Sequence, residues 1–429
     1  MFGNEMLGTI PSMPRNHSWI AFSLLILVTA SSCASSPSPK STSDPFVSPS
    51  PTPFQPGLEA APSSAPTFDS ESVPTFTPYP TAVLKNGTLV MPQVSSSTGL
   101  PPIVIDPLTG LPPADPSLLE RRPLAIKVTN YPRYVRPQAG LTLADEVFEY
   151  YIEGALTRFI AVFYGNNAAM VGPVRSGRYF DEHVVRMYHA FYVFQYADPR
   201  ELMYFRSGDL NPFLVLQGAG NCPPFFNSDR QIETYNNAYF DITKWNECAA
   251  QLHLDNSPQD IRSGFFSETP PSGAPAATRI FTVYSADDYN YWQYDAASGR
   301  YLRYQETDDT RNNKPEAYAP LTDYVNGQQV AADNIIVLFV SYTFANDNEQ
   351  QDEVYHVNLI DSGNAFVFRN GLAVPARWFR TDINQPLLIT NLDGSPIYMK
   401  PGQTFFEVIG ETSNVSQSGS DWHFEFQKP

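Results

Sequence analysis

The chain has few cysteines, few positive charges and little uninterrupted apolar sequence. Three of its 429 residues are cysteine, and 27 Lys and Arg face 44 Asp and Glu, a formal net charge of −17. Nucleic acids and anionic lipids reward excess Lys and Arg, so we expect no nucleic-acid partner. The sequence has no CxxC motif and no histidine pair at ligand spacing. We therefore expect no metal site and no cofactor.

The apolar run at residues 19–30 is too short to span a bilayer, which takes about 20 residues. Ser31, Ser32 and Cys33 follow it, and this order is typical of a bacterial lipoprotein signal. We expect residues 1–33 to be a cleaved signal whose Cys33 receives lipid. The alternative is an ordinary secretory signal that is cut after Ala30 or Ala34. No other run approaches membrane-spanning length.

Residues 34–98 are dominated by Ser, Thr, Pro and Ala, with a scatter of charges. Such a segment cannot bury enough apolar surface to offset its ordering entropy, so we expect it to be disordered. Extended at about 3.1 Å per residue, it would reach on the order of 100–200 Å. The expected location is therefore the extracytoplasmic face of the cell membrane, with a lipidated N-terminus and a tether.

From about residue 99 the composition becomes globular, and its roughly 330 residues exceed the usual size of one hydrophobic core. We predict an α+β fold: a mixed α/β domain at 99–262, a linker at 263–277 and a mainly antiparallel β domain at 278–429. Outside the cytoplasm, Cys222 and Cys248 are a candidate disulfide worth roughly 3–4 kcal/mol. Two buried free thiols are the alternative.

In the first domain we expect strands at 124–129, 146–152, 157–164 and 191–196, and a short helix at 199–205. Ser176 is expected to cap a helix over 177–188. The second domain is expected to be strand after strand, with hairpin turns at Asn370-Gly371 and Asp393-Gly394. Its expected strands are 280–284, 289–294, 301–305, 335–343, 354–359, 365–368, 387–390 and 404–408.

An ordered series of short motifs runs through both domains. It includes Asp106-Pro-Leu-Thr-Gly-Leu-Pro112, Arg136-Pro-Gln-Ala-Gly-Leu141, Gly172-Pro-Val-Arg-Ser-Gly-Arg178, Phe366-Val-Phe-Arg-Asn-Gly371 and Met399-Lys-Pro-Gly-Gln403. Together they resemble the YerB-like lipoproteins over about residues 104–410. The resemblance implies a two-domain, membrane-tethered envelope protein whose activity is not established.

Two segments depart from the pattern of that family, which places histidines after the strand that follows the Gly-Pro-Val-Arg-Ser segment and again later. Here those places read Phe194-Gln-Tyr-Ala-Asp-Pro-Arg200 and Thr234-Tyr-Asn-Asn-Ala238. If the histidines of relatives serve catalysis, this chain has lost them. We therefore lean against an enzyme and expect no catalytic residue.

Arginines are the strongest candidates for binding. Residues 120–210 hold eleven Lys and Arg against ten Asp and Glu, so the basic charge gathers in the first domain. Arg175 and Arg178 flank Ser176 at the expected helix N-terminus, where backbone N–H groups and guanidinium forks favour an anion. The candidate ligand-binding residues are Arg136, Arg158, Arg175, Ser176 and Arg178. The alternative is that these arginines pair with Asp145, Glu149, Glu153 and Asp181 to hold loops in place.

Two functions with a partner or substrate follow, beside a third, a structural spacer with no ligand of its own. The first is an envelope binding or assembly module, with an anionic glycan, a peptide or another protein as partner. The alternative is a hydrolase of peptidoglycan or phosphoester bonds, with Asp145, Glu149, Glu153 or Asp181 as acid or base. Ser176 is not expected to be a nucleophile, because the sequence has no Gly-x-Ser-x-Gly motif and no identifiable histidine base.

Overall fold

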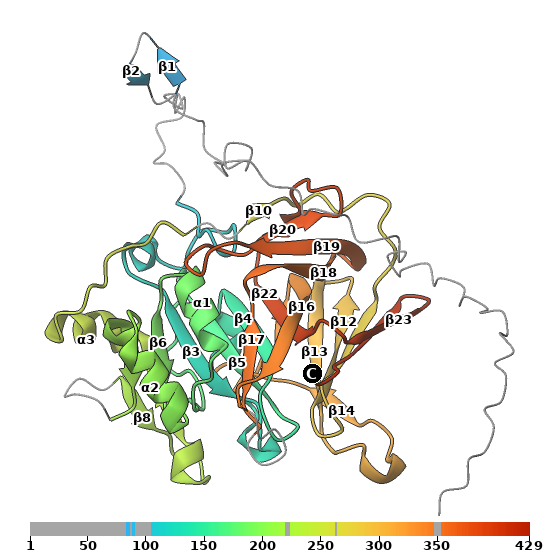
Figure 1. Ribbon diagram of the computed structural model, residues 1–429, viewed down its shortest axis with the longest axis horizontal. Coiled ribbons are helices and arrows are strands. Elements are labelled where there is room, and N and C mark those ends of the chain that lie inside the picture. Colours follow the sequence, from blue (N-terminus) through green and yellow to red (C-terminus); the bar gives the residue numbers. More distant parts are fainter. Residues whose placement is uncertain (1–82, 86–87, 91–103, 219–223, 262–263, 347–352) are drawn as a thin grey trace, which may run out of the picture. The chain divides into compact units, whose positions relative to one another are not determined.

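The computed structural model describes residues 83–85, 88–90, 104–218, 224–261, 264–346 and 353–429. The predicted α+β class is confirmed: a mixed sheet with few helices is followed by mostly antiparallel strands (Figure 1). A short hairpin, β1 (Val83–Lys85) with β2 (Thr88–Val90), precedes them.

The first region carries three α-helices within the described residues, and short 3-10 turns connect its strands. The strands predicted at 124–129, 146–152 and 157–164 are present to within one residue at each end. The elements are η1 (Pro116–Glu120), β3 (Leu124–Thr129), η2 (Arg133–Val135), η3 (Leu141–Leu143), β4 (Glu146–Tyr151), β5 (Thr157–Phe163), α1 (Asp181–Met187), β6 (Phe191–Phe194), α2 (Pro199–Ser207), η4 (Asn211–Phe213), β7 (Leu214–Leu216), β8 (Phe225–Asn227), η5 (Thr234–Asn236), β9 (Ala238–Phe240), η6 (Ile242–Lys244) and α3 (Trp245–Gln251).

The second region consists almost entirely of strands, as predicted, and the turn at Asn370-Gly371 joins β18 to β19. Its elements are β10 (Phe265–Phe266), β11 (Arg279–Val283), β12 (Tyr289–Asp295), β13 (Arg300–Glu306), η7 (Arg311–Asn313), β14 (Tyr318–Pro320), β15 (Ala331–Ala332), β16 (Asn334–Phe344), β17 (Tyr355–Asn358), β18 (Asp361–Arg369), β19 (Leu372–Arg380), β20 (Leu388–Asn391), β21 (Tyr398–Met399), β22 (Thr404–Gly410), β23 (Asn414–Ser418) and β24 (Asp421–Glu425).

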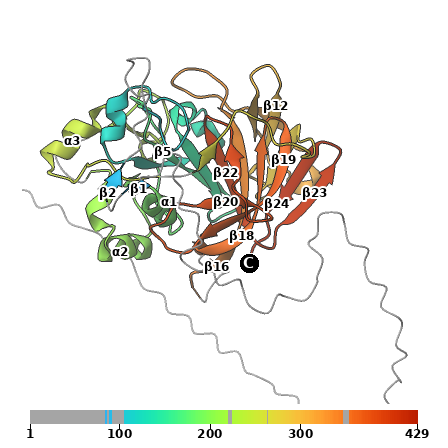
Figure 2. The same ribbon diagram turned by 90° about the horizontal axis from the view of Figure 1, so that it is seen from above.

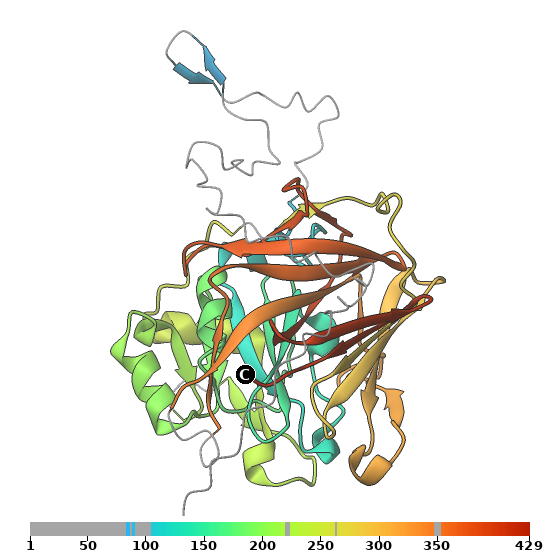
Figure 3. The same ribbon diagram turned by 45° about the vertical axis from the view of Figure 1, so that its right-hand side comes forward.

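One sheet contains strands of both regions, in the order β20-β19-β18-β16-β22-β4-β5-β3-β6-β7 with β17 beside β16. The junction is the parallel pairing of β22 with β4, in which Thr404 lies opposite Glu146 and Val408 opposite Tyr150. Figure 3 shows how strongly the sheet twists, because its red and orange strands lie crosswise to the teal strands. The predicted boundary at 263–277 therefore separates two stretches of sequence whose strands share one sheet.

The two faces of this sheet are covered differently. The helices α1 and α2 lie on one side of β3–β6, and the strands β12–β14 lie on the other (Figure 1); a view from above shows the same division (Figure 2). Successive side chains of a strand point to opposite faces. Lys127, Tyr150 and Arg158 therefore face the helices, whereas Glu149 and Phe159 face the second sheet.

The second sheet has the order β14-β13-β12-β11-β24-β23, with β15 beside β13. A fully buried arginine joins it to the first sheet: Arg303 of β13 donates from Nη2 to Glu149 Oε2 at 2.5 Å and from Nη1 to Glu407 Oε1 at 3.1 Å. Its guanidinium also lies over the rings of Phe159 and Trp292. Two strands of one sheet and one strand of the other thus meet at a single charge.

Replacing Arg303 with Met should lower the free energy of unfolding by about 3–5 kcal/mol, because two buried carboxylates would lose their common partner. Arg279→Met is the control, since the Arg279–Asp421 pair is exposed and should contribute about 1 kcal/mol or less. Urea unfolding of both variants measures the difference. Equal stability of Arg303→Met and Arg279→Met would contradict the role given to Arg303.

Candidate functional site

The segment before α1 runs along the ends of two strands. The backbone N–H of Arg175 donates to the carbonyl of Lys127 at 3.1 Å, and that of Gly177 donates to the carbonyl of Tyr196 at 2.7 Å. The helix begins at Asp181, with Phe180 at its N-cap. The predicted helix start at residue 177 and the capping role of Ser176 are therefore wrong, because hydrogen bonds to β3 and to the end of β6 hold this backbone extended.

Asp181 occupies the position that the sequence suggested for a bound anion. Its carboxylate accepts hydrogen bonds from Lys127 Nζ at 2.9 Å, Tyr150 Oη at 2.7 Å, Tyr192 Oη at 2.5 Å and the backbone N–H of Arg178 at 2.8 Å. Burial lowers the pKa of Lys127 to about 7, although Asp181 opposes the shift. The start of α1 is thus already neutralised by a carboxylate of the protein itself.

Gly177 allows this network to form. A Cβ at Gly177 would lie 2.2 Å from the Tyr192 hydroxyl, closer than real Cβ atoms come to any neighbour. The glycine in the Arg-Ser-Gly-Arg motif therefore lets the loop pass directly over the Tyr192 hydroxyl, which in turn donates to Asp181.

Arg178 is balanced by two carboxylates. It forms a bidentate pair with Glu153, including a 2.7 Å bond from Nε, and its Nη1 lies 3.8 Å from Glu201. Burial of Glu153 opposes ionisation, but the hydrogen bonds and charge of Arg178 lower the pKa of Glu153 below its usual range. Arg178 thus has the kind of carboxylate partner that the alternative of a pinned loop expects.

Arg158 and Arg175 carry the unbalanced charge of the cluster. Arg158 is 9% exposed, and its Nη1 donates to the carbonyl of Ser176 at 2.7 Å. Within the described part of the chain, neither arginine has a carboxylate at ion-pair distance. Burial, together with the charges of Arg178 and Arg175, lowers the pKa of Arg158 to about 9. The arrangement is a half-enclosed positive centre.

Arg136 makes its contacts at the second sheet. Its Nη2 donates to Glu306 Oε1 at 2.6 Å, Nη1 donates to the Glu306 carbonyl at 2.7 Å, and Nε donates to the Asn130 carbonyl at 3.0 Å. Of the five predicted binding residues, the structure thus brings together Arg158, Arg175, Ser176 and Arg178, while the guanidinium of Arg136 is engaged by Glu306.

The four carboxylates considered for hydrolysis are all engaged by other groups of the protein, and Glu153 and Asp181 share Arg178 as a partner. Glu149 is buried against Arg303, Glu153 is paired with Arg178, and Asp181 accepts four hydrogen bonds. Asp145 lies with Asp106 in a further buried cluster. Each of these four carboxylates therefore already has partners within the described part of the protein.

Glu201 of α2 was not among the predicted site residues. It is 1% exposed, and both of its carboxylate oxygens are buried without a hydrogen-bond partner among the described residues. Burial raises the pKa of Glu201 to about 7, although Arg178 opposes the shift. Its place in a short polar helix gave no sign of burial; the residue is enclosed only because α2 packs over the arginine cluster.

A pair of aspartates joins the start of the described globular region to the sheet. Asp106 accepts from the Leu108 backbone N–H at 2.9 Å, and Asp145 accepts from the Gly165 backbone N–H at 2.9 Å and from Asn166 Nδ2 at 2.8 Å. Burial raises the pKa of Asp106 to about 6, and burial together with the charge of Asp106 raises that of Asp145 well above its usual value. The pair therefore holds a proton in mildly acidic solution.

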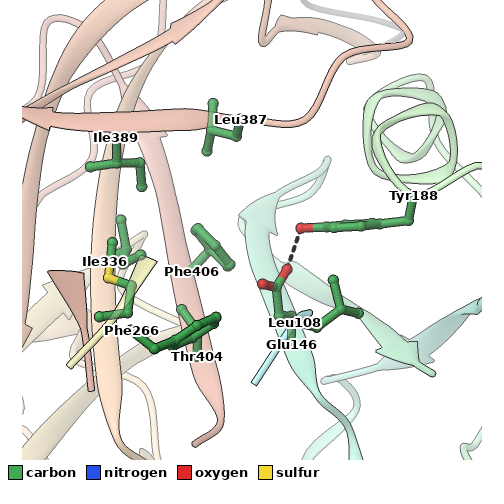
Figure 4. A pocket seen from close by; sticks show the side chains of 10 residues that line it. Leu108, Glu146, Tyr188, Phe266, Ile336, Leu387, Ile389, Thr404 and Phe406 are labelled. Atoms are coloured by element: carbon green, nitrogen blue, oxygen red, sulfur yellow. Dashed lines mark hydrogen bonds between the residues drawn. The ribbon is translucent and has the colours of Figure 1, made fainter. Parts of the chain in front are cut away.

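A small cavity lies between the ends of β22 and β4, where Tyr188 donates to Glu146 above a floor of apolar side chains (Figure 4). Its volume is about 20 Å³, which is room for about one water molecule. The cavity is therefore a gap in the core beneath α1 rather than a ligand pocket.

Among the described residues, no His, Cys, Asp and Glu side chains gather in threes as a metal site would need, and no helix has the length and hydropathy for a membrane span. Cys248 in α3 is buried and disulfide-bonded. Cys222, its predicted partner, and Cys33 lie outside the described residues. The Cys222–Cys248 pairing and the lipidation of Cys33 therefore stay predictions.

The fold and the cluster define a class of α+β protein in which two regions share one sheet and a basic loop crosses its helical face. The chain belongs to the DUF3048 family of unknown function, whose N-terminal domain matches residues 108–255 and whose C-terminal domain matches residues 280–406. The resemblance seen in the sequence is thereby confirmed.

A relative and a solved structure agree with this assignment. The chain is 25% identical over 317 residues to the "Putative lipoprotein YerB" of Bacillus subtilis (strain 168), covering 73% of this chain and 88% of that protein. The crystal structure of the YerB protein from Bacillus subtilis is similar with a TM-score of 0.58 and 24% identity, over 71% of this chain and 96% of that one. The second comparison shows the fold alone.

The aspartate pair predicts a pH dependence of stability. A raised folded-state pKa means that the native state binds more protons than the unfolded chain, so stability from Asp106 is present below about pH 4 and is lost as pH rises through about 6. Asp106→Asn should remove this loss, which is on the order of 2–3 kcal/mol. Urea unfolding at pH 4 and pH 6.5 measures it, with exposed Asp361→Asn as control. If Asp106→Asn left the difference in free energy of unfolding between pH 4 and pH 6.5 unchanged, the raised pKa of Asp106 would be refuted.

Proposed function

We propose that the protein is a lipid-anchored module on the extracytoplasmic face of the cell membrane, which binds an anionic group of an envelope glycan or peptide at Arg158 and Arg175. The observation that carries this proposal is Arg158, a nearly buried guanidinium with one hydrogen bond, to the carbonyl of Ser176, and no carboxylate at ion-pair distance among the described residues, although Glu153 lies near enough to favour its charge.

A buried charge is costly unless it is paired. Arg178 shows how the protein meets this cost elsewhere, because Glu153 clamps it on one side. Arg158 and Arg175 lack such a clamp among the described residues, although burial and the charge of Arg178 lower the pKa of both. A carboxylate or phosphate from outside would supply the missing charge, and guanidinium forks bind both in bidentate geometry.

Binding is preferred to hydrolysis because of where the acids lie. Beside the arginine cluster, Glu201 has a pKa raised by burial to about 7, which would suit an acid or base. It is 1% exposed and lies 3.8 Å from Arg178, so a substrate held at Arg158 would meet the arginines before Glu201. The assignment therefore remains a binding or assembly module.

The anchor is supported by the sequence around Cys33 and by the name of the Bacillus subtilis relative, "Putative lipoprotein YerB". A diacylated or triacylated cysteine holds a protein on a membrane far more firmly than one acyl chain does. The binding module would then stay at the membrane, and the Pro/Ser/Thr-rich stretch would set its reach.

Arg158→Met should weaken binding of the full chain to anionic envelope polymers by at least about tenfold, since one charge-assisted hydrogen bond contributes about 1.5–3 kcal/mol. Retention on purified cell-wall material at several salt concentrations measures this. Arg279→Met, at an exposed arginine of the second region, should bind as the parent does. Equal retention of both variants would count against the site.

Cys33→Ser should abolish lipidation, so the protein should be released into the medium or stay uncleaved. Fractionation of expressing cells and metabolic labelling with a fatty acid measure this. Cys248→Ser is the control, because it changes another cysteine and leaves the signal intact. Recovery of the Cys33→Ser form in the membrane fraction at its normal processed size would exclude the lipid anchor.

A further inference from the structure

Two exposed tyrosines lie beside Arg175, although they are about a hundred residues apart in the chain. Tyr134 is presented by η2 and is 48% exposed, and Tyr235 is presented by η5 and is 57% exposed. Arg175 Nη1 donates to the carbonyl of Tyr235 at 3.0 Å, and its guanidinium carbon lies 5.4 Å from the centre of the Tyr235 ring. We call Tyr134, Tyr235 and Arg175 the tyrosine–arginine ledge.

The ledge is fixed before any ligand arrives. Arg230 Nη1 donates to the carbonyls of Val135 at 2.9 Å and Pro137 at 3.1 Å and to Tyr239 Oη at 2.9 Å, which holds the η2 turn. Tyr134 donates to Glu233 at 2.7 Å and accepts from Asn236 Nδ2 at 2.9 Å, which holds η2 against η5. These side chains are therefore already ordered, so binding loses little free energy in fixing them.

Two buried polar atoms in or beside the ledge have no hydrogen-bond partner among the described residues. Arg175 Nε is buried and has no hydrogen-bond partner among the described residues. The same is true of Oδ1 of Asn236, whose residue is fully buried. Buried polar groups in folded proteins are rarely left unmatched, and a ligand or a water molecule commonly completes them. Here such atoms occur directly beside two exposed rings.

We infer that the ledge is a subsite for one pyranose ring of an acidic glycan, whose carboxylate reaches Arg175 and Arg158. This inference rests on the proposed function and names its ligand class. Tyrosine rings offer a flat apolar surface with a polar tip, which suits the C–H face and the hydroxyls of a sugar. The neighbouring guanidinium groups suit its carboxylate. A free phosphate ion would not use the rings, and an acidic peptide presents no flat C–H face to them.

Titration calorimetry of the full chain with tetragalacturonate, maltotetraose, tetraglutamate and inorganic phosphate tests this inference. Tetragalacturonate should bind at least about tenfold more tightly than the other three, because it alone combines a pyranose ring with a carboxylate. Tyr134→Ala with Tyr235→Ala should reduce its affinity to that of tetraglutamate and leave tetraglutamate unchanged. Tyr235→Leu repeats the test with one exposed side chain, in case the double variant does not fold.

Tyr398→Ala removes a tyrosine that is 52% exposed on β21, and it should change nothing. Equal binding of tetragalacturonate and tetraglutamate, or no effect of the Tyr134 and Tyr235 changes, would overturn the ledge while leaving anion binding at Arg158 in place. Failure of every anion to bind, or no effect of Arg158→Met on any of them, would overturn the proposed function and the ledge with it.

Discussion

The rest of the structure depends on the parallel contact between β4 and β22, with Arg303 behind it. The backbone pairing joins strands that are more than 250 residues apart into one sheet. Arg303 then reaches from the second sheet to one carboxylate on each of these two strands, Glu149 and Glu407. Pairing so distant in sequence has a large closure entropy to overcome. A buried charge that is satisfied only when all three strands are in register makes that pairing specific, because a slip of one residue would turn Glu149 to the other face.

The same constraint positions the candidate site. Glu149 and Tyr150 are neighbours on β4 and point to opposite faces, so the register that places Glu149 on Arg303 also places Tyr150 under α1. Tyr150 and Lys127 then meet Asp181, which fixes the start of α1 and the loop carrying Arg175 and Arg178. The basic cluster thus depends on a charge in the second sheet. A substitution of Arg303 would therefore alter the basic cluster by rotating β4, and not through a direct contact with the arginines.

Local patterns predicted the strands well, because each buried strand carries its own apolar run and turn residues; β3, β5 and β13 are examples. The hairpin turn at Asn370-Gly371 likewise follows from residues that adopt positive φ. What sequence could not predict is set by distant packing. The sharing of one sheet by two regions has no local signal in the sequence. The helix α1 starts four residues later than predicted because the loop before it is hydrogen-bonded to Lys127 of β3 and to Tyr196, which follows β6. Glu201 is buried because α2 packs beside Arg178. For the site, the sequence predicted which arginines are candidates. It could not predict that Arg178 is paired with a carboxylate while Arg158 is not, because that depends on the three-dimensional arrangement.

An acidic protein with an anion-binding site is physically consistent. Charges separated by more than a Debye length, about 8 Å at physiological ionic strength, are largely screened from one another in solvent. At physiological ionic strength an anion at Arg158 therefore responds to Arg175, Arg178 and Glu153 nearby, and the net charge of −17 acts over longer distances only in weak salt. In weak salt, long-range repulsion slows the approach of every polyanion, whereas short-range guanidinium contacts hold the one whose shape fits the site. Moderate salt should thus help association before it weakens the bound state, a pattern opposite to that of a basic surface, whose affinity only falls with salt.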